Sequence, residues 1–237
     1  MTGANCAVDD PPAGHIPPWA VGRGRGLCSA RWMDQQVRAV IDELTAQAEK
    51  HDGAEADRLR RWRVLEEPAG RLLGLLVRAA GVREVVEVGT SRGVSTLWLA
   101  EAVRATDGRV VSIDTDADAQ QQAATSLERA GVAPWVTLRR ADGGQYLATL
   151  PDASVDLLFL DAERTEYPAW WPHPVRVLRP GGLLVADNAI SHPDEIAPLA
   201  ALLQQSPELS TTTLEIGKGE FVAVRDRRHP DAAAHVG

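Results

Sequence analysis

The chain has 237 residues, of which 44% are hydrophobic and 24% are charged, which suits one globular α/β domain with a modest N-terminal addition. Its formal net charge of −8 disfavours a general binder of nucleic acid or anionic membranes, because both partners would be repelled at long range. The sequence also lacks an apolar run of about 20 residues and the pattern of a signal peptide. We therefore expect a cytoplasmic protein with no membrane-spanning segment.

Residues 1–30 are rich in proline and glycine and show no periodicity, which indicates a flexible N-terminal extension. This segment holds both cysteines, Cys6 and Cys28, which form neither a metal-type cluster nor a secreted disulfide framework. Two interpretations stay open: a tail without a role, or a segment that folds over the active site or against a partner subunit.

Two amphipathic helices are predicted within residues 31–80, because apolar residues recur there at helical spacing. The first series is Val37, Val40, Ile41 and Leu44, and the second is Leu65, Ala69, Leu72, Leu73, Leu76 and Ala80.

From residue 81 to residue 237, short β-branched runs alternate with helical segments. Strands are predicted over residues 84–88, 109–113, 135–139, 155–160 and 183–186, and helices near residues 94–104, 117–130 and 167–178. This alternation implies right-handed crossovers and a parallel sheet covered on both faces. Two further strands, over residues 210–214 and 220–224, flank Gly217-Lys218-Gly219 and predict a hairpin. The expected fold is α/β: a Rossmann-like, doubly wound, mostly parallel seven-stranded sheet with a C-terminal antiparallel strand and N-terminal helices.

The first predicted strand runs into the loop Glu87-Val88-Gly89-Thr90-Ser91-Arg92-Gly93, and a helix begins near Val94. Ligands of open parallel sheets bind outside the carboxyl ends of the strands. Glycines let a ligand approach the backbone closely, and a helix N-terminus adds exposed amide donors. The Gly-x-x-x-Gly spacing alone is equally consistent with a tight strand-to-helix turn.

Acidic residues follow the next two strands. Asp114 lies 25 positions after Gly89, where a carboxylate can accept hydrogen bonds from both hydroxyls of a ribose. The alternative is a solvated residue that caps the next helix, but the glycine loop favours ribose binding. Asp142 can face an adenine amino group or act as a turn residue, and the sequence does not decide between these two roles.

Asp161 ends the fourth predicted strand, and Asp187-Asn188 ends the fifth. Neighbouring parallel strands bring these oxygen-bearing side chains to one edge of the sheet. Two carboxylates and an amide oxygen suit octahedral Mg²⁺, whereas the absence of Cys and His from the set disfavours zinc. The other interpretation is that Asp187-Asn188 merely opens a loop.

The stretch from Val85 to about Val224 resembles the class I S-adenosylmethionine-dependent methyltransferases, and within them the caffeoyl-CoA and catechol O-methyltransferase-like group. The matching runs are VVEVGTSRGVSTLWLA, RVVSIDTD, VDLLFLDAERTEY and VLRPGGLLVADN, in family order and spacing. The resemblance implies S-adenosyl-L-methionine as cofactor and makes residues 31–237 a methyltransferase domain. Together with the loop chemistry it places the cofactor-binding residues at Glu87, Gly89, Thr90, Ser91, Gly93, Ser95, Asp114, Asp142 and Asp161.

The same resemblance favours a divalent metal, with Mg²⁺ expected, held by Asp161, Asp187 and Asn188. The family commonly has a lysine three residues after the first metal ligand, assigned as general base, whereas this chain has Arg164 there. Arginine stays protonated, so it is a poor base but a good clamp for an anion. His192, with an unperturbed pKa of about 6.5, is the best substitute. A loop histidine bound to backbone or water, or proton loss to water aided by the metal and Arg164, stays an alternative.

We therefore expect a metal-assisted O-methyltransferase that acts on a hydroxyl of a small phenolic, catechol-like or vicinal diol acceptor. A homodimer is expected from the resemblance alone. The alternatives are a methyltransferase that acts on another nucleophile or on tRNA, and a non-catalytic cofactor-binding module. The net charge weighs against tRNA, and the three converging oxygen ligands weigh against a pure binding module.

Overall fold

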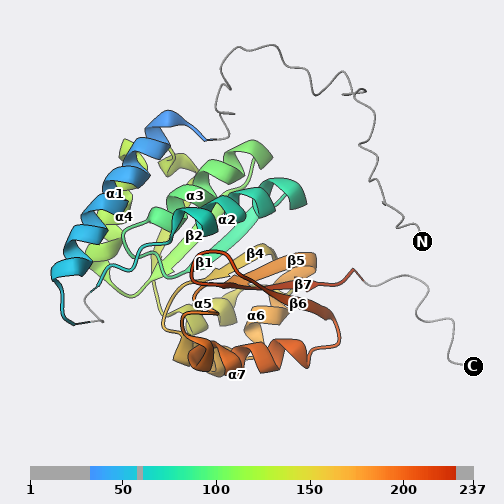
Figure 1. Ribbon diagram of the computed structural model, residues 1–237. Coiled ribbons are helices and arrows are strands. Elements are labelled where there is room, and N and C mark those ends of the chain that lie inside the picture. The colour runs from blue at the N-terminus through green and yellow to red at the C-terminus, as the bar shows by residue number, and fades with distance from the viewer. Residues whose placement is uncertain (1–32, 58–60, 228–237) are drawn as a thin grey trace, which may run out of the picture. The chain divides into compact units, whose positions relative to one another are not determined.

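A seven-stranded sheet organises the part of the chain that the computed structural model describes, which is residues 33–57 and 61–227 (Figure 1). The strand order is β3-β2-β1-β4-β5-β7-β6. The strands are β1 Glu84–Val88, β2 Arg109–Asp114, β3 Val136–Arg140, β4 Val155–Leu160, β5 Leu178–Ala186, β6 Leu209–Leu214 and β7 Glu220–Arg225. The first five strands pair in parallel, whereas β7 runs antiparallel to both β5 and β6. This arrangement confirms the predicted fold class.

The central strands are buried because helices cover the sheet on both sides. All six residues of β4 are buried, and four of the five residues of β1 are buried. Their Val- and Leu-rich runs are typical of parallel strands packed on both faces. Val88 at the end of β1 pairs with Ile113 of β2 and with Leu160 of β4. The carboxyl ends of these three strands therefore lie at the same level.

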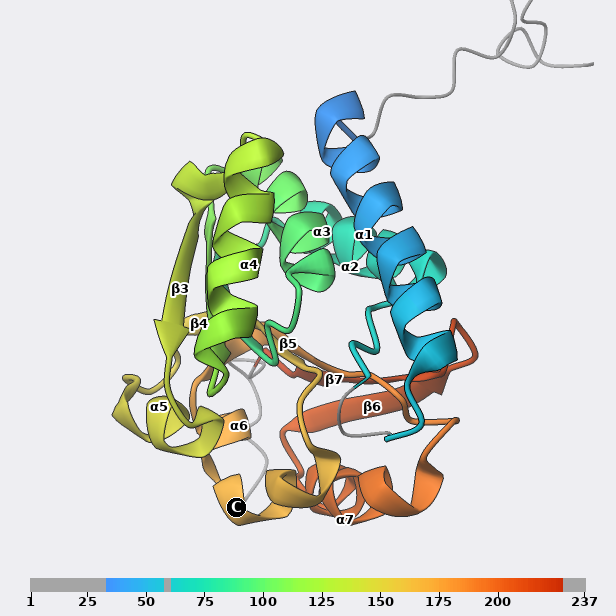
Figure 2. The same ribbon diagram turned by 90° about the vertical axis from the view of Figure 1, so that its left-hand side faces the viewer.

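Helices α1, α2, α3 and α4 lie on one side of the sheet, and α5, α6 and α7 lie on the other (Figures 1 and 2). Their bounds are α1 Gln35–Ala54, α2 Glu67–Ala80, α3 Val94–Val103, α4 Ala117–Arg129, α5 Gly143–Thr149, α6 His173–Arg176 and α7 Pro193–Gln204. Within the described residues they are joined by the 3₁₀ helices η2 Arg104–Thr106, η3 Ala133–Trp135 and η4 Arg164–Trp170. The two N-terminal helices predicted from apolar spacing are α1 and α2.

Local sequence chemistry explains several helix ends. Asp34 accepts a hydrogen bond from the N–H of Gln36 and so caps α1. Pro68 stands in the first turn of α2, where no intrahelical N–H is needed. Gly81 ends α2 in the left-handed conformation, with φ of 62°.

The structure corrects the helix expected over residues 167–178. This stretch contains Pro168, Pro172 and Pro174, each of which removes a backbone donor. It therefore divides into the end of η4, the single turn of α6, and the start of β5 at Leu178. Strand β5 begins at Leu178, five residues before the predicted start. The prediction was late because Gly181 and Gly182 are typical of a turn, whereas here they lie within an irregular first part of the strand.

Helices α5 and α7 were not predicted. Helix α5 is only seven residues long, and α7 carries Pro193 at its start and Pro198 inside it, so both lack a clear helical signal in the sequence. The expected N-terminal extension over residues 1–30, with Cys6 and Cys28, lies outside the described residues.

Candidate active site

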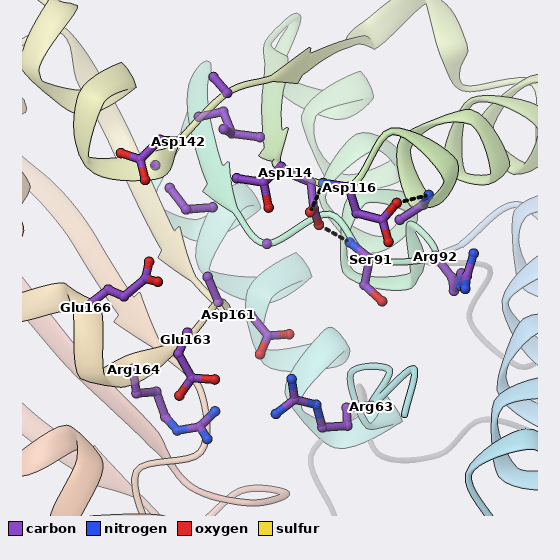
Figure 3. A pocket seen from close by; sticks show the side chains of 18 of the residues that line it. Arg63, Ser91, Arg92, Asp114, Asp116, Asp142, Asp161, Glu163, Arg164 and Glu166 are labelled. Carbon is purple, nitrogen blue, oxygen red and sulfur yellow. Dashed lines mark hydrogen bonds between the residues drawn. The ribbon is translucent and has the colours of Figure 1, made fainter. Parts of the chain in front are cut away.

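A cavity of about 620 Å³ opens at the carboxyl ends of the parallel strands. The segments that follow β1, β2, β3, β4 and β5 each contribute to its wall, and the loop before α2 contributes residues 61–63 (Figure 3). A volume of this size lies within the range that is usual for small-molecule and cofactor sites. The structure therefore has a cavity at the edge of the sheet where the sequence predicts a ligand site.

The loop after β1 turns tightly because of its glycines. Gly89 has φ of 108°, and a Cβ atom at this position would collide with the carbonyl oxygen of Asp161. Its N–H donates to the carbonyl of Ile113 at 2.8 Å, which ties the loop to the end of β2. Gly93, with φ of 85°, begins α3. Glycine is needed at Gly89 so that the loop can pass directly over the end of β4.

Asp114 is held against the cavity wall by two backbone amides. Its Oδ2 accepts the N–H of Ser91 at 2.9 Å, and its Oδ1 accepts the N–H of Asp116 at 2.9 Å (Figure 3). The cap of α4 is instead Asp116, which accepts from the N–H groups of Asp118 and Ala119. The helix-capping role considered for Asp114 thus belongs to its neighbour, and Asp114 lines the cavity.

Asp142 has the turn role that the sequence left open, and its role toward an adenine amino group stays a prediction. It caps α5 by accepting the N–H of Gln145 at 2.8 Å, and it also lines the cavity (Figure 3). Trp170 of η4 lines the same part of the cavity and packs against Tyr167, with 5.0 Å between the ring centroids. One carboxylate and one indole therefore stand at this end.

The other predicted cofactor residues divide into two groups. Gly89, Ser91 and Asp161 line the cavity. The remaining four are buried and are not part of its lining: Glu87, Thr90, Gly93 and Ser95. The sequence pattern identified the loop as a whole but could not separate its cavity-facing residues from those beneath them.

Glu87 is the most unusual of the buried residues because it is a carboxyl group with no exposure. Its Oε2 accepts the hydroxyl of Thr96 at 2.5 Å, whereas its Oε1 has no partner among the described residues. Burial raises the pKa of Glu87 to about 7, although the hydroxyls of Ser112, Ser95 and Thr96 oppose this. The group is therefore near half-protonated at neutral pH.

Asp161 and Asp187 meet at the edge of the sheet, as predicted. Leu160 of β4 pairs with Ala186 of β5, so the next residue of each strand begins a neighbouring loop. Burial and the charge of Asp187 raise the pKa of Asp161 well above its usual range. Burial also raises the pKa of Asp187, which is 5% exposed. Asn188 follows with φ of 71°, and its N–H donates to Oδ1 of Asp187 at 2.6 Å.

Sequence reasoning missed two charged residues beside this pair. Glu220, the first residue of β7, has no exposure, and neither of its carboxyl oxygens makes a well-aligned hydrogen bond with the described residues. Burial and the charges of Asp187 and Asp161 raise the pKa of Glu220 to about 10. The charge of Lys218 lowers the pKa of both Asp161 and Asp187. The positions of Lys218 and Glu220 after β6 did not indicate a role in the site, because only the pairing of β7 with β5 brings them close to Asp161 and Asp187.

The arrangement fits a hard divalent cation better than a zinc ion. Among residues 33–57 and 61–227 there is no group of three or more His, Cys, Asp and Glu side chains arranged to hold a metal ion. The predicted set of Asp161, Asp187 and Asn188 has only two carboxylates, so it needs the amide oxygen and external ligands. Two neighbouring carboxylates repel each other, and a cation between them would stabilise both.

Neither residue is placed as the sequence predicts: Arg164, the predicted clamp, is already paired, and His192, the predicted base, lies outside the cavity lining. Arg164 is 3% exposed, and its Nε and Nη2 donate to Oε2 of Glu195 on α7 at 2.8 and 2.5 Å. His192 precedes α7 and is partly buried, with its Nδ1 2.9 Å from the hydroxyl of Ser191. Arg164 lines the cavity, whereas His192 does not.

No helix in the described part of the chain is long and apolar enough to cross a bilayer.

The chain matches the O-methyltransferase family over residues 38–217. A candidate O-methyltransferase of Mycolicibacterium vanbaalenii is 36% identical over 170 residues, which cover 66% of this chain and 75% of that protein. A second candidate O-methyltransferase, from Mycolicibacterium smegmatis, is 35% identical over 170 residues, with coverage of 66% and 80%.

Solved structures have the same fold. The O-methyltransferase of tomaymycin synthesis from Streptomyces achromogenes, solved with S-adenosylmethionine, has a TM-score of 0.66 and 27% identity, and the match covers 82% of this chain and 91% of that one. The O-methyltransferase of Bacillus cereus, solved with S-adenosylhomocysteine, has a TM-score of 0.67 and 24% identity, with coverage of 79% and 91%.

Proposed function

Because the chain belongs to the O-methyltransferase family of S-adenosylmethionine-dependent enzymes, we propose that it methylates a hydroxyl of a small phenolic, catechol-like or vicinal diol acceptor. One observation carries this proposal: a single cavity joins Asp114, which suits a ribose, to the edge of the sheet where Asp161 and Asp187 meet. A cofactor and an acceptor bound in such a cavity would touch each other.

We assign the cofactor-binding position to the carboxyl ends of the parallel strands. Asp114 accepts both ribose hydroxyls, and Asp142 accepts the adenine amino group. Gly89 has no side chain that would keep the cofactor from the backbone. This assignment is supported by the backbone amides that already orient Asp114, since a carboxylate held in place loses little freedom when the ribose binds.

The reaction is an in-line displacement. The acceptor oxygen forms a bond to the methyl carbon while the carbon–sulfur bond of the sulfonium breaks, and the bonding electron pair stays on sulfur. The products are the methyl ether and S-adenosylhomocysteine, and the acceptor proton passes to a base. Holding acceptor and methyl group in line supplies a large part of the rate enhancement.

Asp161, Asp187 and Asn188 would hold a divalent cation, with Mg²⁺ as the expected ion. That ion would supply positive charge that favours the deprotonated form of an acceptor hydroxyl, whose unassisted phenol pKa is about 10. The proposal is supported by the like charges of the two neighbouring carboxyl groups, since the charge of Asp187 raises the pKa of Asp161. Two adjacent acceptor oxygens suit such a site best.

We assign a positioning role to Arg164 and assign the acceptor proton to solvent water, because His192 does not line the cavity. The N–H of His192 donates to the carbonyl of Asn188 at 3.0 Å, so the histidine is anchored to the end of the proposed ligand set. The bond from Arg164 to Glu195 joins η4 to α7 and so connects the loops that follow Asp161 and Asn188. A guanidinium stays protonated and cannot itself act as the base.

The test is calorimetric titration of the full chain with S-adenosylhomocysteine and then with Mg²⁺. We expect both to bind, and Asp187→Ala to lose Mg²⁺ binding while it keeps nucleoside binding. Asp194→Ala, which removes an exposed carboxyl from the first turn of α7, is the matched control. Methylation of catechol should depend on Mg²⁺ in the wild type and in the control. Nucleoside binding with no Mg²⁺ signal would leave the enzyme class intact but refute the metal site.

A further inference from the structure

The loop of residues 61–63 forms one wall of the cavity and is fixed there by several contacts. Asp52 of α1 accepts the N–H of Trp62 at 2.8 Å and the N–H of Arg63 at 3.0 Å. The hydroxyl of Ser91 donates to the carbonyl of Trp62 at 3.0 Å. This last bond connects the loop to the residue whose N–H also holds Asp114. The loop is therefore anchored both to α1 and to the segment that follows β1.

Ring contacts hold the same loop from the side. The indole of Trp62 stacks on His51, with 4.5 Å between the ring centroids and 20° between the planes. The guanidinium of Arg92 lies 4.5 Å from the centroid of the Trp62 ring. Trp62 is therefore held by polar contacts along its backbone and by two ring contacts along its side chain.

These anchors hold Arg63 in a conformation that a side chain rarely adopts. Its φ is 45°, in the left-handed region, which is costly for a residue other than glycine and persists only where the surroundings impose it. From this backbone the Arg63 side chain extends into the cavity toward Asp161 and Glu163 (Figure 3). An observed outlier that points a charged group into a cavity suggests a role in ligand binding.

Arg63 differs from the other arginines of the cavity in having no partner for its guanidinium among the described residues. Arg164 binds Glu195, Arg61 donates to the carbonyl of Glu55 at 3.0 Å, and Arg92 lies on Trp62. Arg63 also lies close enough to Asp161 for its charge to act on that carboxyl. Its five N–H donors are thus available to a ligand in the cavity.

The chemistry of the cofactor indicates which ligand group Arg63 meets. With the ribose at Asp114 and the adenine at Asp142, the amino-acid part must continue past Ser91 and Gly89, toward the loop that Ser91 holds. That part carries the only carboxylate of the cofactor. Most other charges on the wall are negative and would repel it, among them Asp114, Asp161 and Glu163. A planar guanidinium binds a carboxylate through two parallel hydrogen bonds.

We propose that Arg63 binds the α-carboxylate of the methionyl part of S-adenosylmethionine, with the loop of residues 61–63 held in place by Asp52 and Ser91. This inference rests on the cofactor placement of the proposed function. It adds a binding residue in a segment for which the sequence carried no motif. It also assigns a role to the left-handed backbone conformation of Arg63.

The test compares two ligands that differ only in this carboxylate. S-adenosylhomocysteine and its decarboxylated analogue, S-adenosyl-3-thiopropylamine, are titrated calorimetrically into the wild type, Arg63→Gln and Arg63→Lys. The wild type should bind S-adenosylhomocysteine roughly tenfold or more tightly than the analogue, because a hydrogen-bonded charge pair is lost with the carboxylate. Arg63→Gln should abolish this preference, and Arg63→Lys should retain part of it, since an ammonium is a point charge without the fork.

Arg83→Gln is the control, because Arg83 is an exposed arginine beside the opposite end of β1 and should leave the preference unchanged. If Arg63→Gln lowers both affinities by the same factor, the preference persists and the assignment to the carboxylate is overturned. It is equally overturned if Arg63→Gln leaves both affinities unchanged but weakens 3,4-dihydroxybenzoate relative to catechol, which would assign Arg63 to an acidic acceptor. If neither nucleoside binds the wild type, the cofactor placement itself has failed, which is a distinguishable result.

Discussion

At the residue scale, the acidic side chains of the cavity fall into two chemical groups. Asp114 and Asp142 accept hydrogen bonds from backbone N–H groups, which hold their carboxyl groups in place. Asp161, Asp187 and Glu220 instead lie close together: the charge of Asp187 raises the pKa of Asp161 and of Glu220, and Lys218 is a neighbouring cation. The first group suits neutral donors such as ribose hydroxyls, and the second suits a cation.

Asp114→Ala should weaken S-adenosylhomocysteine binding roughly a hundredfold or more, because two hydrogen bonds to a carboxylate contribute about 1.5 kcal/mol or more each, which together is about 3 kcal/mol. Isothermal titration measures this directly. The matched control is Asp118→Ala, which removes an exposed carboxyl from the first turn of α4. Equal affinities for the wild type and Asp114→Ala would remove Asp114 from the ribose site.

Glu87 should make the stability of the protein fall with rising pH. Its pKa is raised from 4.5 in the unfolded chain to about 7 in the folded protein. The folded state therefore binds this proton more tightly, and the stabilisation is complete below pH 4.5 and lost as pH rises through 7. The full effect is about 3 kcal/mol, since one pKa unit corresponds to about 1.4 kcal/mol.

Glu87→Gln removes this titration, so its free energy of unfolding should change less between pH 5 and pH 8 than that of the wild type. Urea denaturation at several pH values measures the difference, with the exposed Glu128→Gln as control. A pH dependence identical to that of the wild type would show that Glu87 ionises normally in the folded protein.

At the element scale, the site depends on how closely three loops pass one another. The loop after β1 lies on the loop after β4 at Gly89, and the loop after β5 is bonded to the hairpin of β6 and β7 through the N–H groups of Ala189 and Ile190. Arg164 and Glu195 join η4 to α7. The cavity is therefore built by contacts between elements that are far apart in the chain.

Gly89→Ala should destabilise the protein by about 2 kcal/mol or more, because the new Cβ is strained at positive φ and collides with backbone. Urea denaturation reports the change. Gly53→Ala is the matched control, since a Cβ on this exposed residue of α1 meets nothing within 4 Å. Helix propensity predicts that this control is neutral or stabilising by up to about 1 kcal/mol. Wild-type stability in Gly89→Ala would mean that the two loops can separate freely.

At the scale of the whole molecule, two global properties favour a small acceptor over a nucleic acid. The formal net charge of −8 opposes approach to a phosphate backbone, and the cavity of about 620 Å³ is of a size for a cofactor with a small partner. The expected homodimer stays a prediction from family resemblance.

S-adenosylhomocysteine at a hundredfold excess over its dissociation constant should stabilise the folded protein by about 2.7 kcal/mol. For a domain of this size, that corresponds to a rise in Tm of roughly 5 to 10 °C. Differential scanning calorimetry measures the shift, and unmodified tRNA at moderate ionic strength should produce none. A tRNA-induced rise of similar size would favour the nucleic-acid alternative.

The hydrophobic pattern of the sequence was sufficient to predict those elements whose burial shows directly in their own residues. Strands β1 and β4 begin and end where their apolar runs do, because both faces of a central parallel strand must be buried. The acidic residues at the strand ends were also recognisable, since a strand end is a local feature. Proline and glycine misled the prediction over residues 167–182, where tertiary pairing decides between turn, helix and strand.

The sequence by itself thus determined the sheet, the family resemblance and the positions of Asp114, Asp161 and Asp187. Only the tertiary structure decided which side chains share a cavity. Glu220 joins the carboxyl cluster because β7 pairs with β5, and Arg63 enters the cavity because Asp52 and Ser91 hold its loop. Neither partnership has a periodic or local signature, since each depends on contacts between residues that are distant along the chain.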